Sequence, residues 1–164
     1  MLIAVSRSEE DTTSADRLFI LIILTPDFCP PIYFFGPRGI GMETKHILLV
    51  DDFKDNRELY EYFLSRKGFR VTLASDGQEA LDKAFAFSPD VVVLDLSLPV
   101  LNGWEVTRRL KADERTKHIP IVVLSAYDYS SATAEIGCQG FLVKPCLPDT
   151  MIAEIGRVLG TNAN

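Results

Sequence analysis

Five polar residues stand where runs of apolar residues end, and together their side chains could carry out phosphoryl chemistry. They are Asp51, Asp52, Asp95, Ser125 and Lys144. If the apolar runs are parallel strands of one sheet, these side chains meet at its carboxyl edge, where open α/β sheets bind ligands. Three carboxylates at close range repel one another, and a divalent cation and a lysine can compensate them. An all-oxygen site of this kind suits Mg²⁺.

The chemistry that fits this set is phosphoryl transfer to a carboxylate. Asp95 is placed to attack phosphorus as a nucleophile and to form an aspartyl phosphate. The cation and Lys144 would neutralise charge on the phosphoryl oxygens, and Ser125 could donate a hydrogen bond to one of them. The pair Asp51 and Asp52 could by itself simply cap a helix, but its alignment with the other polar residues favours the functional interpretation.

Alternating strands and helices must position these residues. Short runs rich in Val, Ile and Leu predict strands that are buried on both faces, as in a parallel sheet. Segments with one apolar face predict the helices between them. The alternation predicts a doubly wound α/β fold of the flavodoxin-like type, with a five-stranded parallel sheet in the order 2-1-3-4-5. We expect strands at residues 46–50, 69–73, 91–94, 119–124 and 140–143, and helices between residues 55 and 68 and between 76 and 89, then at 104–112, 127–137 (a weak signal) and 148–159.

Three local expectations concern the two histidines and the first helix. His46 begins the strand, and like His118 it has no metal-ligand spacing, so we expect both rings to face solvent. Asp55 has Glu58 three residues later, the spacing of a capping box, so Asp55 is the expected N-cap. Leu59 is expected on the buried face of this helix.

Composition narrows the class of function. The 164 residues are 47% hydrophobic and 24% charged, which is typical of one globular domain with a sizeable core. The net charge is −6 and no basic stripe is present, so nucleic acid is not an expected partner. The apolar run at residues 18–24 is shorter than the roughly 20 residues of a membrane span, and we expect no membrane partner either.

The cysteines indicate a reducing compartment. Cys138 and Cys146 flank a predicted strand that would hold them roughly 25 Å apart. A disulfide requires Cα atoms within about 7 Å of each other. We therefore expect free thiols and a cytoplasmic location.

The first 44 residues differ from the rest of the chain. They have two interpretations: a genuine N-terminal extension, or a mis-assigned start, with translation beginning at Met42. The second interpretation is favoured because the regular pattern begins four residues after Met42. The expected domain then covers residues 45–160, with a tail at 161–164.

The ordered set of motifs resembles the receiver domain of bacterial two-component response regulators. Each motif alone is weak, but all occur in the expected order and the resemblance covers about residues 45–160. The segments that carry it are residues 47–52, 89–99 with Gly103, 119–126 and 141–145.

The resemblance implies roles for the acidic residues. Asp95 would be the phosphoacceptor. Asp52 would be a direct Mg²⁺ ligand, and Asp51 would act directly or through water. The backbone carbonyl of Ser97 would be a further ligand.

The resemblance also implies a switch. Ser125 stands at the position of the switch hydroxyl and Phe141 at that of the switch aromatic residue. Lys144 would pair with the phosphoryl group, and its bond to Pro145 is expected to be cis.

Two features depart from the usual pattern of this family. Leu98 replaces the methionine that usually precedes the proline, a volume-conserving change. The segment from Ser125 to Lys144 is about one helical turn shorter than is common, so the fourth helix is expected to be short or irregular.

The leading functional hypothesis is a stand-alone phosphorylation switch. A histidine kinase or histidine phosphotransfer protein would donate to Asp95, and an unknown protein would receive the signal, because too few residues follow the domain for an output domain. A degenerate receiver acting as a phosphorylation-independent interaction module is one alternative. A haloacid-dehalogenase-like phosphatase is another, although that family uses a second acid two residues after the nucleophile, where this chain has Ser97.

Overall fold

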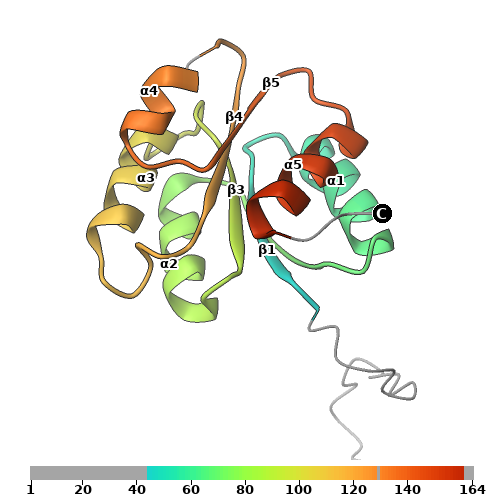
Figure 1. The fold of residues 1–164 in the computed structure, drawn as a ribbon, viewed down its shortest axis with the longest axis horizontal. Coiled ribbons are helices and arrows are strands. Elements are labelled where there is room, and N and C mark those ends of the chain that lie inside the picture. The colour runs from blue at the N-terminus through green and yellow to red at the C-terminus, as the bar shows by residue number, and fades with distance from the viewer. Residues whose placement is uncertain (1–43, 129, 161–164) are drawn as a thin grey trace, which may run out of the picture. The chain divides into compact units, whose positions relative to one another are not determined.

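The computed structural model describes residues 44–128 and 130–160, which form a five-stranded parallel sheet with helices packed on it (Figure 1). The strand order is β2-β1-β3-β4-β5, so the predicted doubly wound, flavodoxin-like fold is confirmed. The interpretations of the N-terminal extension and of the tail at 161–164 lie outside the described residues. The strands are β1 (His46–Val50), β2 (Arg70–Ala74), β3 (Val91–Asp95), β4 (Ile121–Ser125) and β5 (Gly140–Val143). The helices are α1 (Lys54–Arg66), α2 (Gly77–Phe87), α3 (Gly103–Ala112), α4 (Ser130–Glu135) and α5 (Pro148–Leu159).

The central strands are buried on both faces, which explains their continuous apolar composition. In β3, Val92 and Leu94 contribute to a core cluster with α2 and α3, whereas Val91 and Val93 contribute to a second cluster with α1 and α5. Figure 1 shows the same division, with α2 and α3 on one side of the sheet and α1 and α5 on the other. The sheet is therefore a rigid platform whose carboxyl edge carries the polar residues.

Side chains at the helix starts explain where α2, α3 and α5 begin. Asp76 accepts a hydrogen bond from the Glu79 N–H at 2.8 Å, and Asn102 accepts one from the Glu105 N–H at 3.0 Å. Both are N-cap contacts that satisfy an otherwise free helix N–H group. Pro148 occupies the first turn of α5, where its missing N–H costs nothing.

The expected start of α1 is wrong. The helix begins at Lys54, so Asp55 lies inside its first turn, and the N-cap position is Phe53, which makes no side-chain capping bond. The Asp51 carboxylate instead accepts the Phe53 N–H at 2.9 Å, so a site residue anchors this end of the helix. Leu59, expected on the buried face, is 48% exposed, because Tyr60 and Leu64 are the residues of this helix that face the core.

His46 is buried, contrary to the expectation that it faces solvent, and only 4% of its surface is exposed. Its Nε2 lies 2.8 Å from Thr72 Oγ1, and its Nδ1 lies 2.8 Å from the Arg70 guanidinium. Both partners are on β2. The neighbouring strand therefore provides polar contacts that the sequence around His46 does not indicate.

The fourth helix is short, as expected from the spacing between Ser125 and Lys144. It contains six residues, fewer than any other helix of the described chain. No helix within the described residues combines the length and the apolar character needed to span a membrane.

Candidate metal and phosphoryl site

Strand register brings the predicted polar residues to one edge of the sheet. Asp51, Asp95, Ser125 and Lys144 lie within two residues of each other along the strand direction. The paired residues at these strand ends are Val50 with Leu94, Asp95 with Leu124, and Ser125 with Val143.

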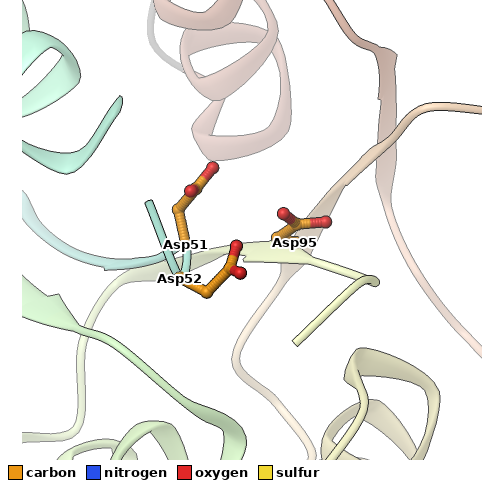
Figure 2. A group of neighbouring side chains, drawn as sticks. All are labelled: Asp51, Asp52 and Asp95. Atoms are coloured by element: carbon orange, nitrogen blue, oxygen red, sulfur yellow. The ribbon is translucent and has the colours of Figure 1, made fainter. Parts of the chain in front are cut away.

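Three carboxylates form a compact acidic cluster at this edge. Asp51, Asp52 and Asp95 each offer one oxygen within 4.8 Å of the others (Figure 2). Asp51 and Asp95 are buried, and Asp52 is partly exposed. Carboxylate oxygens gathered in this way suit a hard divalent cation. Three of the predicted metal-site residues are thus close together.

Lys144 compensates two of these charges. Its ammonium donates hydrogen bonds to Asp51 Oδ2 at 2.7 Å and to Asp95 Oδ2 at 2.5 Å. Burial alone would lower the pKa of Lys144, but the hydrogen bonds to both carboxylates raise it above its usual value, so the side chain is a cation. The Lys144–Pro145 peptide bond is cis, as expected.

Asn56 and Arg57 support the acidic pair from the first turns of α1. The Asn56 amide nitrogen lies 3.2 Å from both carboxylate oxygens of Asp51. One guanidinium nitrogen of Arg57 donates to the backbone carbonyls of Asp51 and Asp52, at 2.6 and 2.9 Å. Sequence reasoning missed both residues; the available signal was two hydrogen-bond donors in the helix turn directly after an acidic pair.

The Oδ1 atom of Asp52 indicates whether the residues of this site could bind a cation. This atom is buried and has no hydrogen-bond partner among the described residues. A buried carboxylate oxygen without a partner is costly, and it calls for a ligand such as a metal ion or an ordered water. The residues present therefore fit a divalent cation.

Asp95 is held at the start of the β3–α3 loop. Its Oδ1 accepts the Ser97 N–H at 2.9 Å, while its Oδ2 accepts from Lys144. The carboxylate is therefore oriented by one backbone donor and one cation. The Ser97 side chain is exposed, and the role of its carbonyl as a metal ligand stays a prediction.

The two predicted switch residues occupy the neighbouring strands. Ser125 is buried at the end of β4, and its Oγ accepts the Tyr127 N–H at 3.1 Å. This leaves the hydroxyl proton of Ser125 available to donate elsewhere. Phe141 is partly buried on β5 and packs against the cluster that lies under α2 and α3. Their switch roles stay predictions.

Tyr60 joins α1 to the loop that follows Lys144. Its hydroxyl donates to the Cys146 carbonyl at 2.9 Å, and burial raises the pKa of Tyr60, so the hydroxyl stays protonated. The contact ties the helix bearing Asn56 to the β5–α5 loop.

Comparison with known proteins identifies similar chains. Residues 47–156 match the family model of the response regulator receiver domain. The polar-differentiation response regulator DivK of Brucella ovis is 32% identical over 120 residues, which cover 71% of this chain and 98% of that protein.

Two solved structures are similar in fold and sequence. The receiver domain of a sensor histidine kinase from Pseudomonas aeruginosa, with a magnesium ion coordinated in its active site cleft, is 31% identical with a TM-score of 0.66. The match covers 73% of this chain and all of that one. The chemotaxis response regulator CheY4 of Vibrio cholerae is 32% identical with a TM-score of 0.67, covering 71% of this chain and 99% of that one.

Proposed function

We propose that this chain, which belongs to the response regulator receiver domain family, is a phosphorylation-dependent signalling switch. Receiver domains are switches, not classical enzymes, and the acidic cluster with Lys144 is the observation that carries the proposal. Membership in this family argues against the phosphatase alternative. The exposed Ser97, in place of a second acid, agrees with that choice.

Asp95 is the proposed phosphoacceptor. One of its carboxylate oxygens forms a bond to phosphorus while the P–N bond of a donor phosphohistidine breaks and the electron pair returns to the imidazole. Lys144 donates a hydrogen bond to the same carboxylate at 2.5 Å. After transfer its ammonium group can pair with the negative charge on the phosphoryl oxygens. The Ser97 N–H holds the other oxygen of Asp95 in place.

Asp51, Asp52, Asp95 and the Ser97 carbonyl are the proposed holders of Mg²⁺. When bound, Mg²⁺ neutralises charge on the phosphoryl group and orients it for in-line attack. The partnerless Oδ1 of Asp52 supports this assignment, and the magnesium in the Pseudomonas aeruginosa receiver supports it by similarity.

Ser125 and Phe141 are the proposed relay. The free hydroxyl proton of Ser125 can donate to a phosphoryl oxygen, which would favour one of two arrangements of the β4–α4 loop and of Phe141. A shift from 1:99 to 99:1 requires about 5.5 kcal/mol. Two charge-assisted hydrogen bonds, at about 1.5–3 kcal/mol each, approach that value.

The proposed donor is a histidine kinase or a histidine phosphotransfer protein, and the proposed output is contact with another protein. The proposal has no role for nucleic acid or membrane. A cytoplasmic location is part of it, supported by the unbridged thiols of Cys138 and Cys146.

Substitution of the acceptor tests the proposal. The full chain is incubated with Mg²⁺ and acetyl phosphate, and phosphorylation is read by intact mass. We expect one phosphoryl group on the wild type, none on Asp95→Asn, and wild-type labelling of Asp149→Asn, an exposed control on α5. Full labelling of the Asp95 variant would refute the assignment, and no labelling of the wild type would favour the phosphorylation-independent interaction module.

A further inference from the structure

Asn56 makes an unusually complete contact with a site residue. Its amide nitrogen is the same distance, 3.2 Å, from Asp51 Oδ1 and Oδ2. A carboxylate only accepts hydrogen bonds, so the NH₂ group of the amide faces it, and both Asp51 oxygens accept from this one nitrogen. The contact therefore fixes the orientation of the Asp51 carboxylate.

The acceptor capacity of Asp51 is fully used in this arrangement. Oδ1 accepts from the Phe53 N–H and from Asn56, while Oδ2 accepts from Asn56 and Lys144. Two lone pairs on each oxygen match these four contacts, and the Asp51 side chain has no exposed surface for water to reach. Asp51 thus has no free lone pair while Lys144 stays in place, and the departure of Lys144 would free one, on Oδ2 only.

Asp52, unlike Asp51, has a carboxylate oxygen that accepts no hydrogen bond from any residue that the structure describes. Its Oδ1 is buried and without a hydrogen-bond partner among the described residues, so it offers a ligand atom. The two adjacent acids of the pair therefore differ, and the donors around Asp51 cause the difference.

Asn56 is the most permanent of these side-chain donors. The long side chain of Lys144 can leave Asp51 when a cation or a phosphoryl group enters. Asn56 stands on α1, and the bonds from Arg57 to the Asp51 and Asp52 carbonyls lock the same turn of helix to the strand end. The backbone that carries Asn56 is therefore held close to Asp51.

We propose that Asn56 is a specificity-determining residue that prevents Asp51 from coordinating a cation through both oxygens and so makes the site selective for Mg²⁺ over Ca²⁺. The inference rests on the proposed Mg²⁺ site. Mg²⁺ retains several waters and needs few protein oxygens, whereas Ca²⁺ takes six to eight oxygen ligands and accepts bidentate carboxylates. An Asp51 carboxylate that can offer one oxygen at most limits the oxygen ligands that the protein provides, which disfavours the larger ion.

The test is the binding of MgCl₂ and of CaCl₂ to the full chain, measured separately by titration calorimetry. Asn56→Ala frees one lone pair on each Asp51 oxygen, and we expect the ratio of the Ca²⁺ Kd to the Mg²⁺ Kd to fall about tenfold, the lower end of effects seen for outer partners of metal ligands. Asn56→Ser, a second neutral shortening, should shift the ratio the same way and is measured in parallel in case the alanine variant folds poorly. Ser65→Ala is the matched control, since Ser65 is a neutral, exposed residue of the same helix.

The outcomes separate this inference from the proposed function. An Asn56 variant that binds both cations more weakly in parallel, or keeps the wild-type ratio, overturns the inference, because a purely structural role would not change selectivity. A wild type that binds neither cation, or an Asp52→Asn variant that binds Mg²⁺ as tightly as the wild type, overturns the proposed metal site itself.

Discussion

At the scale of single residues, Lys144 links the buried acidic residues of the site. It is the side-chain cation that contacts both Asp51 and Asp95, and its own side chain is only 20% exposed. Two buried carboxylates with one ammonium form an arrangement that is costly to break, because the partner left behind is a buried charge. A bound divalent cation can supply the same compensation.

We expect Lys144→Met to lower the free energy of unfolding in Mg²⁺-free buffer by about 3 kcal/mol, because two buried carboxylates lose their counter-charge. Added Mg²⁺ should restore most of this loss. Urea denaturation with and without Mg²⁺ measures both effects. The control is Lys54→Met, whose exposed ion pair with Glu58, at 3.4 Å, should contribute little. A Lys144 variant as stable as the wild type without Mg²⁺ would contradict this account of the site.

At the scale of elements, the β3–α3 loop positions Asp95 through a tight approach and a strained turn. A Cβ atom on Gly103 would collide with the Asp95 carbonyl oxygen and would lie 2.7 Å from the Leu96 Cα, so α3 can pack this close to the strand end only with glycine there. In the loop between Asp95 and Gly103, Val100 has a φ of 65° and is 87% exposed. The Leu101 N–H donates to the Pro99 carbonyl at 2.7 Å, which closes a three-residue turn around Val100.

A β-branched residue with this φ is strained, and Val100→Asn should relieve the strain, since asparagine tolerates the left-handed region. We expect the free energy of unfolding to rise by about 1 kcal/mol, because the exposed valine loses little buried surface. Urea denaturation provides the measurement. The contrasting variant is Val143→Asn in β5, where the strand prefers valine and stability should fall. Equal destabilisation by both substitutions would show that Val100 is not strained.

At the scale of the whole molecule, the two ends of the sheet have different electrostatics. The carboxyl edge carries the acidic cluster, while the amino end carries His46 in a polar network. The Asp90 carboxylate accepts a hydrogen bond from the backbone N–H of His46 at 2.8 Å and forms an ion pair with Lys45 at 2.9 Å. The Arg70 guanidinium contacts the His46 imidazole. Since a guanidinium can only donate, His46 Nδ1 is the acceptor, the ring is neutral, and its Nε2–H donates to Thr72.

Stability should therefore depend on pH through His46. Burial, and secondarily Arg70, hold the pKa of His46 below its ordinary value of 6.5, although Asp90 opposes the shift. The His46 side chain therefore binds a proton more readily in the unfolded chain than in the folded one. Its contribution to the free energy of unfolding is constant above pH 6.5 and falls as the pH drops below 6.5.

Denaturation of the wild type at about pH 7.5 and about pH 5.5 should show a loss of about 1 kcal/mol at the lower pH. His46→Gln should lose clearly less between the same two conditions, whereas His118→Gln, at an exposed position, should behave like the wild type. The comparison uses the pH dependence of each variant and not its absolute stability. Identical pH dependence in the wild type and His46→Gln would exclude this histidine as the cause.

The position of the five polar residues at the sheet edge could be predicted from the sequence because a small number of physical rules is enough to determine it. Apolar runs such as Val91 to Leu94 form strands only when both faces are covered, and right-handed crossovers leave few strand orders. Once the strands are parallel, Asp95 and Lys144 must meet at the carboxyl edge. The short fourth helix was expected because the segment from Ser125 to Lys144 is shorter than is common in the family that the sequence resembles.

The partners of these residues depended on the tertiary structure. Asp55 had the right spacing to cap α1, but the Asp51 carboxylate, fixed by the sheet, takes the Phe53 N–H and moves the start of the helix. Asn56 reaches Asp51, and β2 encloses His46, only because of how the elements pack. Local sequence determines where strands and helices form through side-chain shape and hydrophobic period. Which polar groups lose water and find each other is decided by packing between distant segments.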